Sequence, residues 1–116
     1  MRIDVESKNG VLVVRVEGEL DAATAPVFRE AVESALDKTM ARDLILNLKG
    51  VGFIDSSGLG AILGRYRRVS QAGGRVCLGS VPSKTRRILD LSGIPRIIPI
   101  FESEAEALAS FGAGTE

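Results

Sequence analysis

The sequence predicts a single α/β domain, spanning residues 1–116, with a mostly parallel five-stranded sheet and four helices. Its size and composition are typical of one globular domain, since 45% of the 116 residues are apolar and 26% are charged. Five short segments have the residue types and lengths of strands. After the first two, strands alternate with stretches of helical spacing, and such alternation implies parallel pairing with right-handed crossovers.

The first two strands are predicted to form an antiparallel hairpin. Residues 3–7 alternate between apolar and polar side chains, as an edge strand does. Asn9-Gly10 is typical of a two-residue hairpin turn. Residues 11–16 are nearly all apolar and follow as a more buried strand.

A first helix is predicted after Gly18-Glu19-Leu20-Asp21. Either Asp21 or Thr24 caps it, and Pro26 lies in its first turn, where the missing N–H costs little. Spacings of three and four place one apolar face on Val27, Phe28, Ala31, Val32, Ala35 and Leu36. Residues 44–48 then form a central strand.

A second helix is predicted after the turn Asp55-Ser56-Ser57-Gly58, and Ala72-Gly73-Gly74 ends it. Its apolar stripe comprises Leu59, Ile62, Leu63, Tyr66 and Val69. We expect the cations of this helix and the next to lie on solvated helix faces: Arg65, Arg67, Arg68, Lys84, Arg86 and Arg87.

The last third of the chain contains two more strands and two more helices. Residues 75–78 form a strand in which Cys77 is a core residue, and residues 97–100 form an edge strand because Pro99 cannot donate a ladder hydrogen bond. Ser83 is expected to cap a short helix that carries Ile88, Leu89 and Leu91 and ends at Ser92-Gly93. Ser103 and Glu106 form a capping box for the final helix, which buries Ala107, Leu108 and Phe111. Residues 112–116 are expected to fray.

The composition argues against several classes of function. There is no histidine and a single cysteine, so neither a Ser-His-Asp triad nor a transition-metal site is expected. Fifteen basic and fifteen acidic residues give a formal net charge of zero, so the composition lacks the excess of positive charge that is typical of nucleic-acid-binding proteins. Residues 1–6 lack the apolar run of a signal peptide, and the longest apolar runs are far short of a membrane span, so neither element is expected. We therefore expect a cytoplasmic binding protein that is not an enzyme, with no metal, cofactor or membrane partner.

The turn Asp55-Ser56-Ser57-Gly58 is the candidate functional site. It ends one strand and opens one helix, and functional sites in open α/β sheets lie outside the carboxyl ends of strands. A phosphate on a hydroxyl there is favoured by the helix N-terminus. Asp55 and Ser56 are equally well explained as helix caps, but one cap does not require three polar residues in a row. Both interpretations of Ser57 remain open on composition alone.

Several motifs together resemble the anti-sigma factor antagonists, the single-domain members of the STAS family, and most closely the sporulation type. The motifs are Gly18-Glu19-Leu20-Asp21, Leu46-Asn47-Leu48, residues 53–60, Leu63-Gly64-Arg65-Tyr66, Gly73-Gly74 and Leu91-Ser92-Gly93. The resemblance covers nearly the whole chain. It implies a STAS-type mixed sheet with an N-terminal antiparallel hairpin and four helices.

The resemblance also implies a partner-switching mechanism. The unphosphorylated protein would bind an anti-sigma factor that is also a serine kinase, and so free a sigma factor. The kinase would phosphorylate Ser57, which ends binding, and a serine phosphatase would reverse this. The implied partner-binding residues are Asp21, Asp55, Ser56, Ser57, Gly58 and Leu59.

One departure and three alternatives accompany this interpretation. Ala22-Ala23 is smaller and less polar than the matching segment of sporulation-type relatives, which leaves the identity of the partner open. The main alternative is a non-switching scaffold subunit of a stress-signalling assembly. A lipid-transport accessory domain would typically lack the pair Ser56-Ser57, and a hydrolase using Ser57 would lack a base.

Overall fold

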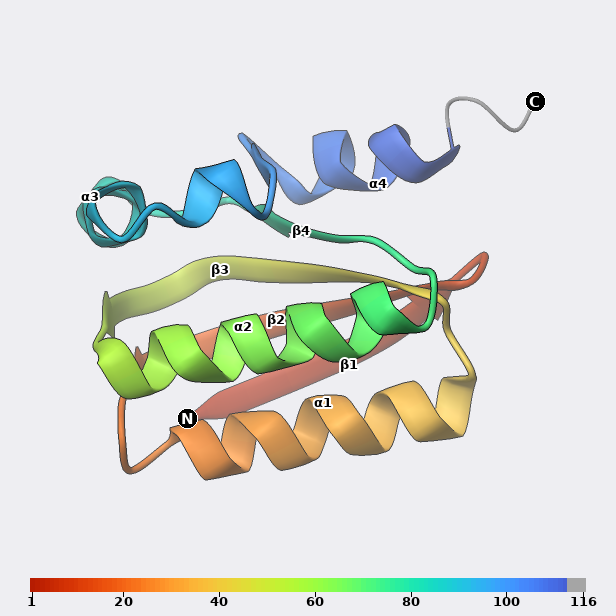
Figure 1. Ribbon diagram of the computed structural model, residues 1–116, viewed down its shortest axis with the longest axis horizontal. Coiled ribbons are helices and arrows are strands. Elements are labelled where there is room, and N and C mark those ends of the chain that lie inside the picture. The colour runs from red at the N-terminus through yellow and green to blue at the C-terminus, as the bar shows by residue number, and fades with distance from the viewer. Residues whose placement is uncertain (113–116) are drawn as a thin grey trace.

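The computed structural model describes residues 1–112 and contains one five-stranded sheet in the order β1-β2-β3-β4-β5 (Figure 1). The strands are β1 (Arg2–Lys8), β2 (Val11–Leu20), β3 (Asp43–Ile54), β4 (Val76–Gly79) and β5 (Ile100–Phe101). The helices are α1 (Ala25–Thr39), α2 (Ser56–Gln71), α3 (Ser83–Leu91), the 3-10 helix η1 (Ile94–Arg96) and α4 (Glu104–Gly112). Residues 112–116 were predicted to fray. Gly112 is the last residue of α4, and residues 113–116 lie outside the described part of the chain.

The strand pairing confirms the predicted mixed sheet. β1 and β2 pair antiparallel, and the remaining neighbours pair parallel. Asn9 and Gly10 join β1 to β2 with φ values of 51° and 82°. Two consecutive left-handed residues are the requirement of a type I′ turn, so Asn9-Gly10 determines the hairpin locally.

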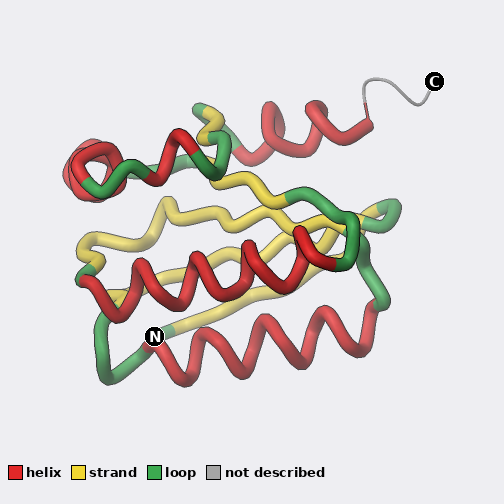
Figure 2. The backbone as a smooth tube through the Cα atoms, in the orientation of Figure 1, coloured by secondary structure: helices red, strands yellow, loops and turns green. Residues whose placement is uncertain are grey.

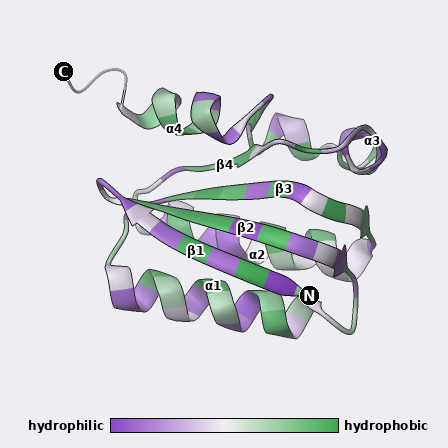
Figure 3. Cartoon of the chain, turned by 180° about the vertical axis from the view of Figure 1, so that it is seen from behind, coloured by the Kyte–Doolittle hydropathy of each residue, from purple (hydrophilic) through white to green (hydrophobic). Residues whose placement is uncertain are grey.

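Helices cover both faces of the sheet. α1 and α2 lie side by side on one face, and α4 lies on the other (Figures 1 and 2). The main core beneath α1 and α2 includes Leu12 and Val14, whereas Val11 and Val13 belong to a smaller cluster beneath α4. Alternate residues of a strand point to opposite faces, so β2 is buried on both sides over this stretch. Hydrophobic residues accordingly run along β2 and β3 between the helical layers (Figure 3).

The last strand begins later and is shorter than the predicted range 97–100, because it comprises only Ile100–Phe101. η1 precedes this segment, and only Ile100 continues into the observed strand, which pairs with Leu78 and Gly79 of β4. Ile98 is buried in the main core, whereas Ile97 is 46% exposed. The apolar residues 97–98 therefore belong to a loop that the side chain of Ile98 holds against the core. The strand is at the sheet edge, as expected.

Three expectations for the helices also need correction. Val27 is 54% exposed and Leu91 is 84% exposed, so neither belongs to the buried face of its helix. Ser83 is the first residue of α3, and Pro82 takes the cap position without a side-chain bond. Ser103 does accept a hydrogen bond from the backbone N–H of Glu106 at 3.1 Å, as in half of a capping box. No helix among residues 1–112 is both long and apolar enough to span a membrane.

Candidate functional site

The candidate site lies where two parallel strands end at one edge of the sheet. β2 and β3 finish together, with Leu20 paired to Ile54. Asp21 follows the first strand and Asp55 follows the second, and the backbone N–H of Asp55 donates to the carbonyl of Leu20 at 3.2 Å. The pairing of these strands therefore brings Asp21 close to the Asp55-Ser56-Ser57-Gly58 turn, although they lie far apart in the sequence.

Asp21 organises the turn that leads into α1. Its Oδ1 accepts hydrogen bonds from the backbone N–H groups of Ala23 at 3.0 Å and Thr24 at 3.1 Å. Thr24 occupies the cap position of α1, but its hydroxyl donates to the carbonyl of Glu19 at 2.7 Å instead of capping the helix. Of the two predicted caps, Asp21 thus supplies the oxygen that holds the turn. One of its carboxylate oxygens is committed to this structural role.

Asp55 is the N-cap of α2. Its Oδ1 accepts a hydrogen bond from the backbone N–H of Gly58 at 3.0 Å, and its extended backbone is that of an N-cap. Gly58 is buried against the end of β2, and a Cβ at this position would lie 2.2 Å from the carbonyl oxygen of Leu20. Only glycine permits this approach. Gly58 therefore allows the start of α2 to pack directly against the end of β2, next to Asp21.

Ser56 and Ser57 are the exposed members of the turn. Both side chains are accessible, and neither hydroxyl has a hydrogen-bond partner within residues 1–112. Leu59 is half-buried and packs against the main core, as expected for a residue with a mainly structural role. A free hydroxyl on the first turn of a helix is open to reaction and lies in a positive local potential.

Arg65 is the residue that sequence analysis placed wrongly. It is 8% exposed, and its Nε lies 2.8 Å from Oε2 of Glu33 on α1. Burial lowers the pKa of Arg65; Glu33 opposes this effect, and Arg29 and Arg68 add to it. The helical spacing contained the signal, because position 65 lies between the buried Ile62 and Val69 at intervals of three and four.

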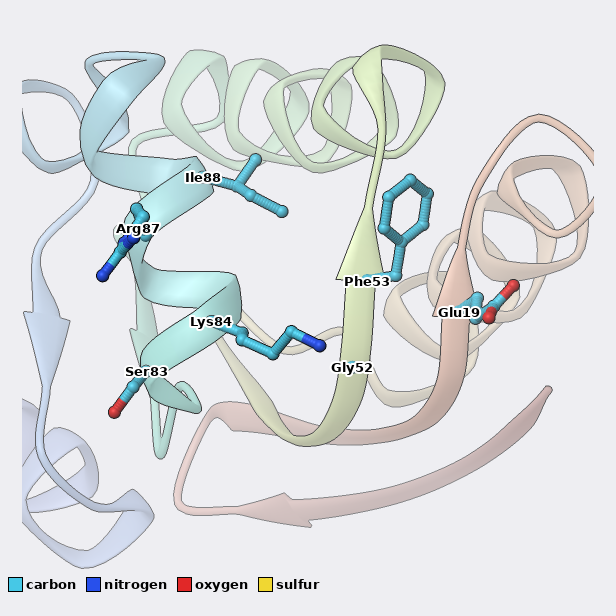
Figure 4. A pocket seen from close by; sticks show the side chains of 7 residues that line it. All are labelled: Glu19, Gly52, Phe53, Ser83, Lys84, Arg87 and Ile88. Carbon is cyan, nitrogen blue, oxygen red and sulfur yellow. The ribbon is translucent and has the colours of Figure 1, made fainter.

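A groove of about 650 Å³ borders the site on the other face of the strand ends (Figure 4). Glu19 pairs with Phe53, and both point away from the core that buries Leu20 and Ile54. Phe53 is 45% exposed, and Lys84 extends from α3 toward β3. The remaining lining residues are Gly52, Ser83, Arg87 and Ile88. The edge thus offers apolar and cationic contacts beside the serine turn.

The described residues offer no cluster of metal ligands at this site. Among residues 1–112, no group of three or more His, Cys, Asp or Glu side chains could hold a metal ion. The site consists of two capping carboxylates, two free hydroxyls and a close-packed glycine. Such a surface is suited to contact a partner or to carry a modification.

Comparison with known proteins assigns the family. A model of the STAS domain matches residues 2–107. The chain belongs to the STAS family. This confirms the predicted resemblance, and the five-stranded mixed sheet with an N-terminal hairpin and four helices confirms the predicted fold.

Two relatives of this STAS protein are named as anti-sigma factor antagonists. The anti-sigma F factor antagonist of Paenibacillus polymyxa is 41% identical over 108 residues, covering 93% of this chain and 92% of its own. The anti-sigma-B factor antagonist of Bacillus subtilis (strain 168) is 32% identical, covering 86% and 90%.

Solved structures of one relative match the fold closely. The anti-sigma factor antagonist SpoIIAA in its unphosphorylated form matches with a TM-score of 0.83 at 26% identity, covering 99% and 100% of the two chains. The phosphorylated form of this Bacillus protein matches with a TM-score of 0.73 at 27% identity, covering 95% and 99%. The chain is a binding protein and not an enzyme, as the sequence predicted.

Proposed function

We propose that this STAS protein is a cytoplasmic anti-sigma factor antagonist of the sporulation type. Unphosphorylated, it binds an anti-sigma factor that has serine kinase activity, and a sigma factor is released. Phosphorylation of Ser57 ends the binding, and a serine phosphatase restores it. One observation carries the proposal: Ser57 presents a free, exposed hydroxyl on the first turn of α2, in the turn that Asp55 caps and that lies against the end of β2 next to Asp21.

The proposed partner-binding surface has a rigid base and an exposed rim. Asp21 and Asp55 hold the two turns through hydrogen bonds to backbone N–H groups, and Gly58 holds the turns together. Ser56 and Ser57 form the exposed rim. Leu59, which is half-buried behind this rim, completes the surface. Because the base is held by strand pairing, the surface needs little ordering when a partner docks.

A phosphate on Ser57 would act as an electrostatic switch. It adds nearly two negative charges next to Asp21 and Asp55, on a surface that an interface would desolvate. A loss of about 3 kcal/mol weakens binding by more than a hundredfold. The names of the relatives support an anti-sigma factor as partner, and the existence of a phosphorylated SpoIIAA supports phosphorylation as a means of control.

The test combines three variants with a candidate anti-sigma kinase from the host. We expect intact-mass spectrometry after incubation with ATP to find one phosphate, peptide mapping to place it on Ser57, and gel filtration to show loss of the complex. Ser57→Ala should remain bound in the presence of ATP, and Ser57→Asp should bind at least a hundredfold more weakly. Ser70→Ala is the matched control, because Ser70 is also an exposed serine of α2 but lies in the last turn of the helix, away from the proposed surface.

Two results would count against the proposal. Equal affinity of the Ser57→Ala and Ser57→Asp variants for the kinase would refute the switch. A complex that persists with ATP and gains no phosphate would instead indicate the non-switching scaffold, with Ser57 as part of a helix cap.

A further inference from the structure

We propose that the pocket between α1 and α2 is an internal receptor for the phosphoryl group of phosphorylated Ser57, with Arg29 and Arg65 as its cations. The inference rests on the proposed function, because it concerns the modified form of the same serine. It adds a binding site within the chain for the group that switches it.

The pocket has the composition of an anion site. It has a volume of about 350 Å³ and lies between α1 and α2, which run side by side in the same direction (Figure 1). Its polar lining residues are Ser57, Arg29 and Arg65, and no carboxylate of the described residues lines it. Small residues such as Gly60 and Ala61 form the wall between Ser57 and Arg65 and leave room there.

Arg65 has hydrogen-bonding capacity that the described chain does not use. The residue is 8% exposed, and its Nη1 atom is buried without a hydrogen-bond partner, while its Nε lies 2.8 Å from Oε2 of Glu33. Its ion-pair partner Glu33 also pairs with Arg68, so one carboxylate serves two guanidinium groups. A buried guanidinium with idle donors is unfavourable, and a phosphate oxygen in the pocket would supply the missing acceptor.

Arg29 adds a second cation on the opposite wall. It is exposed, has no ion-pair partner within residues 1–112, and lies close enough to Arg65 to lower the pKa of that residue. Side chains on a helix lean toward its N-terminus. Because α1 and α2 run in the same direction (Figure 1), the Cα–Cβ bonds of Arg29 and Arg65 both tilt toward the N-terminal ends of the helices, and Ser57 lies on the first turn of α2.

The helix geometry places Ser57 on the correct face for this contact. Ser57, Ala61 and Arg65 follow one another at intervals of four and share one side of α2. The Cα atoms of Ser57 and Arg65 are about 12 Å apart along the axis of α2. The long side chain of Arg65 can span part of this distance. A phosphoryl group extends Ser57 from the other end.

The test uses full-length protein in which phosphoserine is incorporated at position 57 during translation, so that no kinase is needed. Phosphorus NMR then follows the second ionisation of the phosphate. An unpaired phosphoserine has a second pKa of about 6, and pairing with guanidinium groups lowers it. We expect the pKa to lie about half a unit or more below that value, and Arg29→Gln to reverse most of the shift.

Control variants separate the pocket from general charge effects. Arg67→Gln removes an exposed arginine of α2 that does not line the pocket, and should leave the phosphate pKa unchanged. Arg29 is exposed, so its substitution should preserve the fold, which circular dichroism can verify. An unshifted pKa in the parent protein, or equal effects of Arg29→Gln and Arg67→Gln, would overturn the proposal.

Inorganic phosphate added to the unphosphorylated protein distinguishes the source of the anion. Amide shifts at Gly60 and Ala61 that Arg29→Gln removes would show that the same pocket also takes free phosphate. Their absence, together with a lowered phosphoserine pKa, would show that the tether to Ser57 is required. A kinase that fails to modify Ser57 would refute the proposed function and leave this titration unchanged, whereas an unshifted pKa would refute the pocket alone.

Discussion

Replacing Gly58 with alanine tests whether the close approach of α2 to the end of β2 holds the site together. The added Cβ would lie 2.2 Å from the carbonyl oxygen and 3.0 Å from the carbonyl carbon of Leu20. These are backbone atoms, so the helix must move. The same carbonyl oxygen accepts the backbone N–H of Asp55 at 3.2 Å, and movement would weaken this bond.

The expected cost follows from these contacts. Overpacking costs about 1–3 kcal/mol, a weakened buried hydrogen bond adds about 1 kcal/mol, and the higher helix propensity of alanine returns up to about 1 kcal/mol. We therefore expect Gly58→Ala to lower the free energy of unfolding by about 1–3 kcal/mol, or the melting temperature by roughly 4 °C or more. Urea denaturation followed by circular dichroism measures this change.

Gly64→Ala is the matched control on the same helix. No heavy atom lies within 4 Å of the Cβ that this substitution would add. Alanine should therefore stabilise α2 there by up to about 1 kcal/mol. If Gly58→Ala were as stable as the parent within about 0.5 kcal/mol, the steric argument for the position of α2 would be refuted.

Two further substitutions probe the cap of α2 and the anchor of α4. Asp55→Ala removes the acceptor for the Gly58 N–H and should cost about 1 kcal/mol in urea denaturation, while Ser56→Ala should be neutral; equal effects would contradict the assigned cap. Glu104→Gln should cost about 1–2 kcal/mol at pH 7, because both carboxylate oxygens accept hydrogen bonds from Arg15 at 2.8 Å. Hydrogen bonding to Arg15 lowers the pKa of Glu104, so this stabilisation is complete above the usual glutamate pKa of 4.5 and is lost as pH falls through the folded-state value. The difference in unfolding free energy between Glu104→Gln and the parent should therefore shrink below about pH 4.5, and a constant difference would show that charge is not involved.

Most of the fold was predictable because its signals are local. Asn9-Gly10 adopts the two left-handed conformations that a tight hairpin requires, and Asp55 caps the helix that it precedes. The predicted strand at residues 97–100 was placed too early because an apolar run indicates burial and not backbone conformation. Ile98 is buried, but it lies in a loop between η1 and β5.

The candidate site was predictable in its members but not in its arrangement. The residue types of the Asp55-Ser56-Ser57-Gly58 turn indicate a polar strand-to-helix turn, and the structure places it there. Arg65 was missed because a charged side chain on an apolar stripe is ordinarily assigned to solvent. Its burial depends on Glu33, a residue of the neighbouring helix that no local pattern connects to it.

The sequence by itself determined the order of strands and helices, the hairpin turn and the polar strand-to-helix turn at residues 55–58, since each depends on neighbours within one turn or one strand. The tertiary structure alone decided that Asp21 lies close to the Asp55-Ser56-Ser57-Gly58 turn, that Gly58 must be glycine, and that Arg29 and Arg65 share a pocket with Ser57. The physical reason is that these relations depend on how parallel strands align and how two helices pack across them. Such contacts join residues distant in the chain, and the close packing of the core sets their distances.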